Sequence, residues 1–316
     1  MSQSFIGILH LSNAYDKGWN THPKNYELWK NSFEKFWLIV ALDRGANSPI
    51  SSITLAKSKT TDGEALFLLG FYYCVPERRN RGIGSMLFKR VMQKIGDSNA
   101  VIAGGLNSDG IDTALHYQKR YGFNQVYPYH NSYVSIKVSD IICTPLEENE
   151  RDEMFEKVNV HGPDDSNIDD SQFKEFDEMI CEMSRVKYLI NWMKEEGTHS
   201  AILTNKKDAK IVAICCLREY MGGRIAVAPL YSINQNYALL SLQAALSKAN
   251  QTIHNFQMIS AVFPSPNEKA VISVFSKFST SPVEAKKASQ TQFTKKLLFQ
   301  GSDNIFGYPE TAHVYA

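Results

Sequence analysis

The sequence lacks any hydrophobic run long enough to cross a membrane as a helix. Its longest apolar stretch, Leu66 to Val75, has about ten residues, whereas a spanning helix needs about 20. The first residues also lack the basic segment of a signal peptide, and His10 interrupts their short apolar run. We therefore expect a cytoplasmic protein without a membrane partner.

Cysteine is scarce as well. The five cysteines are an odd number, and no two of them have the C-x-x-C spacing of many zinc and redox sites. Reduced thiols in an intracellular protein explain this usage best. The sequence therefore argues against a disulfide framework and predicts no metal site.

Neither sign of charge is in excess. Lys and Arg number 34, Asp and Glu number 33, and the net charge is +1. A nucleic-acid-binding chain would be clearly basic, so no nucleic-acid partner is expected. With 43% hydrophobic and 21% charged residues the composition is globular. At about 100–200 residues per domain, the chain of 316 residues predicts two domains.

The charges are nevertheless unevenly placed. Between Glu147 and Glu178 there are 13 acids and three bases, and this stretch contains the turn-forming run HGPDDSNIDD. We expect a connector that leads into a helix starting near Ser171, because apolar residues then recur at helical spacing as far as Val186. The prediction is a first domain at 1–140, an acidic connector at 141–170 and a second domain at 171–316.

Strand and helix patterns alternate irregularly in the first part. Strands are predicted at 36–42, 50–56, 65–75, 100–103 and 133–138, and helices at 84–95 and 112–121. Several strands precede the first crossover through a helix, which indicates a mixed α/β sheet flanked by helices. The second part repeats this plan weakly, with strands at 201–204, 210–217, 224–230 and 256–262 and helices at 237–249 and 267–278.

The sharpest motif lies between the long strand and the first of these helices. It reads Val75-Pro-Glu-Arg-Arg-Asn-Arg-Gly-Ile-Gly-Ser85. Glycines at a helix start let an anion approach the unpaired backbone N–H groups, and the three arginines add positive charge. The motif predicts a diphosphate site. It is neither a dinucleotide fingerprint, because the third glycine is missing, nor a P-loop, because G-K-[ST] is absent.

Two segments resemble motifs of the GNAT N-acetyltransferases. Arg79-Asn-Arg-Gly-Ile-Gly84 is similar to the [QR]-x-x-G-x-[GA] motif of that family. Ala114 followed by Lys119-Arg-Tyr-Gly-Phe123 is similar to its A-x-x-x-Y-x-K-x-G-F ending. The resemblance covers roughly residues 5–138 and implies the GNAT fold, with acetyl-CoA as acyl donor.

The same resemblance implies a set of coenzyme-binding residues. Backbone amides from Asn80 to Ser85 would hold the pyrophosphate, and the end of the long strand would pair with the pantetheine arm. The predicted residues are Tyr73, Cys74, Val75, Arg79, Asn80, Arg81, Gly82, Ile83, Gly84 and Ser85.

The chain also resembles a branch of GNATs with a second, degenerate GNAT-like domain. Gly18-Trp19-Asn20 is similar to a GWN loop of that branch. In the second half, Pro229 to Asn236 occupies the position of the phosphate motif but contains neither Gly nor Arg. We therefore expect one active site, in the first domain, and a second domain that does not hold the coenzyme.

The catalytic acid is less certain than the coenzyme site. Many GNATs use a Tyr four residues before the glycine of G-F, and that position is Gln118 here, one residue after Tyr117. We predict Tyr117 as the acid, with loss of the acid as the alternative. The general base stays open among His22, His116, His130 and a chain of water molecules.

The acceptor pocket is predicted to be aromatic, although core packing explains the same residues. The predicted substrate-binding residues are Trp19, Asn20, Tyr72 and His130. The reaction implied by the resemblance is transfer of an acetyl group from acetyl-CoA to a primary amine of a small metabolite, by direct attack in a ternary complex. A peptide or protein N-acetyltransferase and a non-catalytic acyl-CoA-binding module are the alternatives, and the oligomeric state is left open.

Overall fold

The computed structural model describes residues 22–45, 48–106, 113–181, 183 and 185–298. Trp19 and Asn20, two of the predicted substrate-binding residues, lie outside this part of the chain. The five cysteines lie within it and are free thiols. None of the helices in the described ranges is both long and apolar enough to cross a membrane.

The first half of the chain contains the predicted strands and helices within a few residues of their expected ends. Its elements are α2 (Asn25–Ser32), β1 (Lys35–Leu42), β2 (Pro49–Lys59), β3 (Ala65–Cys74), α3 (Ile83–Ile95), β4 (Asn99–Gly105), α4 (Thr113–Tyr121), β5 (Gln125–Val126) and β6 (Asn131–Lys137). Helix α3 shows why the prediction worked. Its residues Leu87, Val91 and Ile95, spaced four apart, are buried, and Gly96 ends the helix with a positive φ of 55°.

The second half again contains the predicted elements, together with others that were not expected. It comprises α5 (Glu148–Phe155), β7 (Val158–His161), α6 (Asp170–Glu178), α7 (Val186–Lys194), β8 (Thr198–Asn205), β9 (Ile211–Tyr220), β10 (Arg224–Ser232), α8 (Gln235–Ala249), β11 (Met258–Pro264), α9 (Glu268–Lys277) and β12 (Lys286–Phe293). The acidic stretch therefore contains a helix and a strand of its own.

The helix expected from Ser171 onward was predicted too long. Helix α6 ends at Glu178, and α7 begins at Val186. Asp177 and Arg185 form a buried ion pair with an N–O distance of 2.8 Å. Eight residues of continuous helix would separate them by about 12 Å along the axis, so the pair requires the chain to turn between them.

The strands form one continuous mixed sheet in the order β1-β2-β3-β4-β12-β6-β11-β10-β9-β8-β7, with β5 beside β12. One strand of each half pairs with strands of the other half. Strand β6 of the first half pairs antiparallel with β11, and β12 of the second half pairs antiparallel with β4 and also with β6. The two halves therefore complete each other's sheet.

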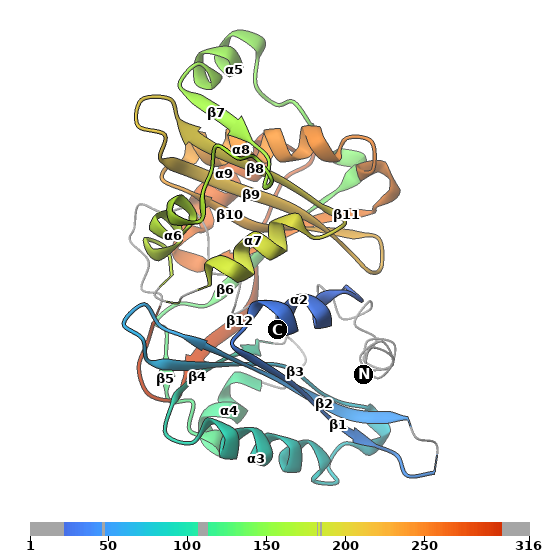
Figure 1. The fold of residues 1–316 in the computed structure, drawn as a ribbon. Helices are drawn as coiled ribbons and strands as arrows, with labels where there is room; N and C mark the ends of the chain where they lie inside the picture. The colour runs from blue at the N-terminus through green and yellow to red at the C-terminus, as the bar shows by residue number, and fades with distance from the viewer. Residues whose placement is uncertain (1–21, 46–47, 107–112, 182, 184, 299–316) are drawn as a thin grey trace.

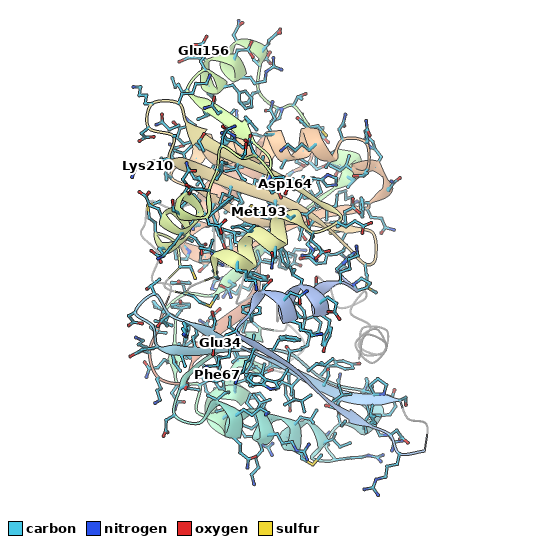
Figure 2. All side chains as sticks on the ribbon, viewed as in Figure 1. Glu34, Phe67, Glu156, Asp164, Met193 and Lys210 are labelled. Atoms are coloured by element: carbon cyan, nitrogen blue, oxygen red, sulfur yellow. The ribbon has the colours of Figure 1, made fainter. Side chains whose placement is uncertain are left out.

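The two halves of the sheet face each other across a shared helical layer (Figure 1). Helices α2, α6 and α7 lie in this layer, and their buried side chains join residues of both halves in one cluster. Helices α3 and α4 cover the outer face of the first half, and α8 and α9 cover the outer face of the second. Figure 2 labels Met193 in the shared layer and Phe67 on the α3 side.

Candidate functional site

Strands β3 and β4 diverge in the middle of the first half. They pair in parallel through only three residue pairs, from Leu66 with Asn99 to Leu68 with Val101. Beyond that point β3 continues to Cys74 with β2 as its neighbour, whereas β4 pairs with β12. The two strand ends therefore open away from each other beyond Leu68 and Val101.

A bulge marks this divergence. Phe71 has a φ of 47°, in the left-handed region that favours glycine, and the register of β3 against β2 shifts between Ser52 and Thr54. The Ser52 hydroxyl donates to the Phe71 carbonyl at 2.9 Å, which helps to hold the bulge. The Phe71 ring contacts Trp29 of α2 with a centroid separation of 5.2 Å. The bulge therefore connects the opened sheet to the shared helical layer.

The loop after β3 leads into a helix with an uncapped N-terminus. Gly82 is the N-cap residue of α3, with a φ of 79° and no side-chain capping bond. The amide of Met86 bonds the Gly82 carbonyl at 3.0 Å. Within the described ranges, the amides of residues 80–85 find no backbone acceptor outside regular elements. Such a helix start has N–H groups and the positive end of its dipole available for an anion.

Gly84 has no room for a side chain, and the sequence alone did not show this. A Cβ at this buried residue would lie 2.6 Å from the hydroxyl oxygen of Tyr72. Tyr72 also contacts Phe88 of α3 and Tyr117 of α4, at centroid separations of 5.2 and 6.2 Å. The structure therefore places Tyr72 beneath the helix start, beside Tyr117, and its role in binding the acceptor stays a prediction.

Tyr117 lies in the core between the sheet and α3. It is 7% exposed, and its ring stacks on Phe88 at 5.7 Å. Burial, together with the neighbouring hydroxyls of Tyr72 and Tyr121, raises the pKa of Tyr117 above its ordinary value of 10.0. Its hydroxyl therefore keeps its proton at neutral pH, as a proton donor must. Gln118 is only partly buried.

The predicted arginines have different surroundings. Arg79 turns back onto the strand end, where its Nε donates to the Cys74 carbonyl at 3.0 Å and its guanidinium lies over the Tyr73 ring. The alternation of side chains along a strand puts Tyr73 on the face opposite Tyr72. Arg81 is exposed beside the helix start. Of these two arginines, Arg81 is the one left to face an anion.

The histidines considered as bases have different surroundings. His130 directly precedes β6, and its carbonyl accepts from the Ser265 amide at 2.8 Å. Burial lowers the pKa of His116, which contacts the rings of Tyr117 and Tyr121. Burial and the charges of Arg218 and Lys24 lower the pKa of His22 to about 4. A group with such a pKa is a weak acceptor for an ammonium proton at neutral pH.

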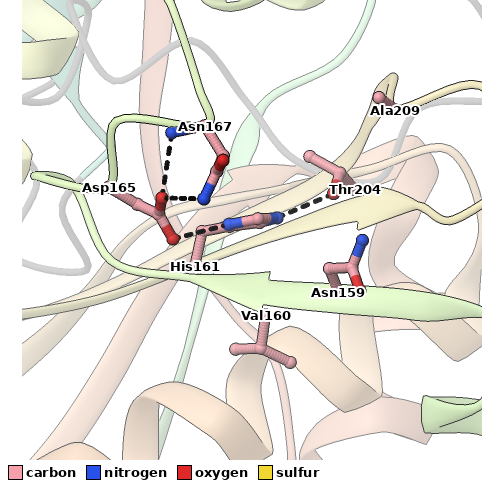
Figure 3. Close-up of a pocket in the computed structure, with 7 residues that line it drawn as sticks. All are labelled: Asn159, Val160, His161, Asp165, Asn167, Thr204 and Ala209. Carbon is pink, nitrogen blue, oxygen red and sulfur yellow. Dashed lines mark hydrogen bonds and ion pairs between the residues drawn. The ribbon is translucent and has the colours of Figure 1, made fainter.

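A separate polar cavity of about 500 Å³ lies at β7 and β8 (Figure 3). His161 lies between the Asp165 carboxylate and the Thr204 hydroxyl, each 2.8 Å from a ring nitrogen. Asp165 also accepts from the amide and the side chain of Asn167. Because the His161, Asp165 and Thr204 groups satisfy one another, this network has a structural explanation.

The sequence analysis missed one unusual residue, Arg218. It is 0% exposed, and its guanidinium lies 4.1 Å from the centre of the Trp192 ring. It belongs to β9, a strand that is otherwise mostly apolar. A single cation inside such a strand is the signal that could have identified it, because a charged residue is rarely fully buried.

No family model and no curated protein matches the sequence. Solved structures are similar to it along almost its whole length. A protein of Pyrococcus horikoshii described as a candidate acetyltransferase has a TM-score of 0.65 at 12% identity, covering 99% of this chain and 93% of that one. A GCN5-related N-acetyltransferase of Sphaerobacter thermophilus has a TM-score of 0.56 at 11% identity, covering 91% and 90%.

A tandem GNAT protein from the clavulanic acid biosynthesis pathway is similar as well. Its TM-score is 0.59 at 11% identity, and the match covers 95% of this chain and 96% of that one. Identities this low establish the fold, and coverage of both halves establishes its repetition. The expected mixed α/β architecture is thus confirmed: the chain has the fold of the GCN5-related N-acetyltransferases, repeated in tandem.

Proposed function

We propose that the protein is an acetyl-CoA-dependent N-acetyltransferase that acts on a primary amine of a small metabolite. The observation that carries this proposal is the uncapped N-terminus of α3 at the mouth of the diverging strands. Unpaired amides, a glycine that admits close approach and Arg81 together suit a pyrophosphate. The similar acetyltransferase structures support the same assignment.

The chain's own residues then have distinct tasks. The amides of residues 80–85 would hold the pyrophosphate, and the end of β3 at Tyr73, Cys74 and Val75 would pair with the pantetheine arm. Gly82, Ile83, Gly84 and Ser85 form the helix start itself. Arg79 supports the strand end through the Cys74 carbonyl. His130 and the residues of α2 would border the acceptor.

The proposed reaction is direct attack in a ternary complex. The amine nitrogen forms a bond to the acetyl carbon, and the carbon–sulfur bond breaks. The leaving thiolate takes the proton of the Tyr117 hydroxyl, which burial keeps protonated. Before the attack the ammonium loses a proton to water, which frees the lone pair of the amine, because the pKa of His22 is too low for that residue to take the proton. The second proton leaves the nitrogen to water as the amide forms.

The proposed division of the chain follows from this assignment. Residues 1–140 form the catalytic domain, 141–170 the acidic connector and 171–316 a second domain without a coenzyme site. Because β6 and β12 are exchanged between the two halves of the continuous sheet, neither domain is complete without the other.

The first test is the melting temperature with and without acetyl-CoA, with free CoA as a control. A ligand at 100 times its dissociation constant stabilises the folded state by about 2.7 kcal/mol, which corresponds to several degrees. A shift followed by release of free thiol with an amine panel supports the enzyme. A shift without turnover of any amine or peptide indicates a binding module, and no shift at saturation refutes the coenzyme site.

A further inference from the structure

Arg218 projects from β9 into the helical layer shared by the two halves. Ile214, Cys216 and Tyr220, two or four residues away on the same strand, belong to the cluster of that layer. The Arg218 side chain is completely buried there. A buried cation is unfavourable unless an anion or a full set of acceptors compensates it.

Most of the hydrogen bonds that would compensate the burial of Arg218 are missing. Nη2 donates to Oδ1 of Asn25 at 3.0 Å, whereas Nε and Nη1 are buried and find no hydrogen-bond acceptor in the described part of the chain. Arg185, the other buried arginine of this layer, donates through Nε and Nη2 to the Asp177 carboxylate. Within the described residues, Arg185 thus has a carboxylate partner and Arg218 has none.

The residues around Arg218 lack partners of the same kind. The Asn25 oxygen accepts from the guanidinium, and the Asn25 Nδ2 is a buried donor that finds no acceptor among the described residues. The hydroxyl of Thr198, directly opposite Arg218 on β8, is also buried and has no partner among them. We call Arg218, Asn25, Thr198 and His22 the Arg218 donor cluster.

His22 adds one more donor to this cluster. Its Nδ1 accepts from the Lys24 amide at 3.2 Å. Burial and the Arg218 charge lower the His22 pKa, so the ring is neutral and carries its proton on Nε2. Glu196, a nearby carboxylate, is exposed and pairs with Lys24 at the surface. The cluster is therefore rich in donors and carries one positive charge.

We propose that the Arg218 donor cluster binds the carboxylate of the acceptor, so that the substrate is an amine that also carries a carboxylate. A carboxylate accepts several hydrogen bonds and matches the single charge of a guanidinium. The amine part of this statement rests on the proposed acetyltransferase function. The carboxylate part rests on the cluster alone.

Helix α2 contacts both this cluster and the opened sheet. Asn25 contacts Arg218, and Trp29, four residues later on the same helix face, contacts Phe71 at the bulge. One turn of helix rises about 5.4 Å, so the cluster lies about one turn beyond the bulge. His22 and Lys24 border the cluster where the chain reaches solvent, since Lys24 is exposed. An acceptor bound here would have its amine directed toward the bulge.

The direct test measures carboxylate binding without any turnover. Melting temperatures are recorded in sodium acetate and sodium succinate against sodium chloride of equal ionic strength, for the wild type, Arg218→Met and Asn25→Asp. We expect the carboxylates to stabilise the wild type and neither variant. Asn25→Asp supplies an internal carboxylate to Arg218, so we also expect its melting temperature to exceed that of the wild type in chloride.

The second test uses pairs of amines that differ only in the carboxylate, such as lysine with cadaverine and γ-aminobutyrate with propylamine. We expect a 10- to 100-fold preference in kcat/KM for the carboxylated member, lost in Asn25→Asp and Arg218→Met through KM. Equal carboxylate stabilisation of the wild type and both variants would overturn the proposal, as would a preference for the amines without a carboxylate. Absence of acetyl transfer, with carboxylate binding intact, would refute only the enzymatic function.

Discussion

The two halves of the chain share a backbone plan but differ at one helix start. In each half a pair of parallel strands separates after three residue pairs, β3 from β4 and β10 from β11. In each half the strand before the helix carries an irregularity, near Phe71 in β3 and between Val227 and Leu230 in β10. The opening of the sheet is thus a property of both halves.

Helices α3 and α8, which follow these strands, differ in whether a side chain caps their first amides. The N-cap residue of α3 is Gly82, which provides no side-chain cap. The N-cap residue of α8 is Asn234, whose side chain accepts from the Tyr237 amide at 2.9 Å. A capping side chain occupies an amide that an anion would need. The second half therefore uses its own residue where the first half leaves amides available.

The next helices differ in the same sense. The buried positions of α4 are Ala114 and Tyr117, whereas those of α9 are Val271, Val274 and Phe275. The second half thus has no hydroxyl on the buried face that corresponds to Tyr117. The comparison teaches that the opened sheet alone does not make a site, since the chemistry depends on a few residues placed upon it.

The largest effect is expected from filling the space at Gly84. Gly84→Val should weaken acetyl-CoA binding by about 100-fold or more, because its side chain would occupy the helix start and displace Tyr72. The matched control is Asn236→Val, at the second position of α8, which should leave binding unchanged. Isothermal titration measures both dissociation constants.

Two results would contradict this assignment to the first half. Unchanged binding in Gly84→Val would remove the α3 start from the site, and weakened binding in Asn236→Val would place a site in the second half. If Gly84→Val does not fold, Gly84→Ala combined with Tyr72→Phe removes the hydroxyl that the new Cβ would meet, and is expected to lose less affinity than Gly84→Val, because the smaller side chain displaces the ring at residue 72 less.

The next effect concerns α4. Tyr117→Phe should lower kcat by about 100-fold and leave the dissociation constant of acetyl-CoA unchanged, because the ring is kept and only the proton donor is lost. Since the pKa of Tyr117 lies above 10.0, this hydroxyl should cause no decrease in the wild-type kcat below that pH. Tyr121→Phe is the matched control, with an expected kcat near that of the wild type. A kcat unaffected by Tyr117→Phe would exclude Tyr117 as the acid.

Regular periodic segments were the predictable part of this fold. The helical repeat of Leu87, Val91 and Ile95 and the apolar runs of the inner strands follow directly from their burial. The motif at residues 75–85 also identified the uncapped helix start. These features are local, so a sequence pattern is sufficient to predict them.

Strand β12 shows what could not be predicted. Its sequence is KKASQTQF, and Ser289, Thr291 and Gln292 are buried although they are polar. The Asn131 side chain donates to Ser289 and Thr291 at 3.0 Å each, which compensates for their burial. These partners are about 160 residues apart in sequence. The exchange of β6 and β12 depends on such distant contacts, which no local sequence pattern reveals.

The smallest effect is expected at the capped start of α8, the counterpart of the uncapped start of α3. Asn234→Ala removes the capping oxygen and should lower the free energy of unfolding by about 1 kcal/mol, measured by urea denaturation. Acetyl-CoA affinity should not change, because the second half also lacks the glycine and the arginine of the first. If Asn234→Ala instead bound a second molecule of acetyl-CoA, the cap alone would have closed a site that the rest of the second half still provides. With affinity unchanged, the cap alone would not account for the proposed lack of a coenzyme site in the second half, and the missing glycine and arginine would contribute to it.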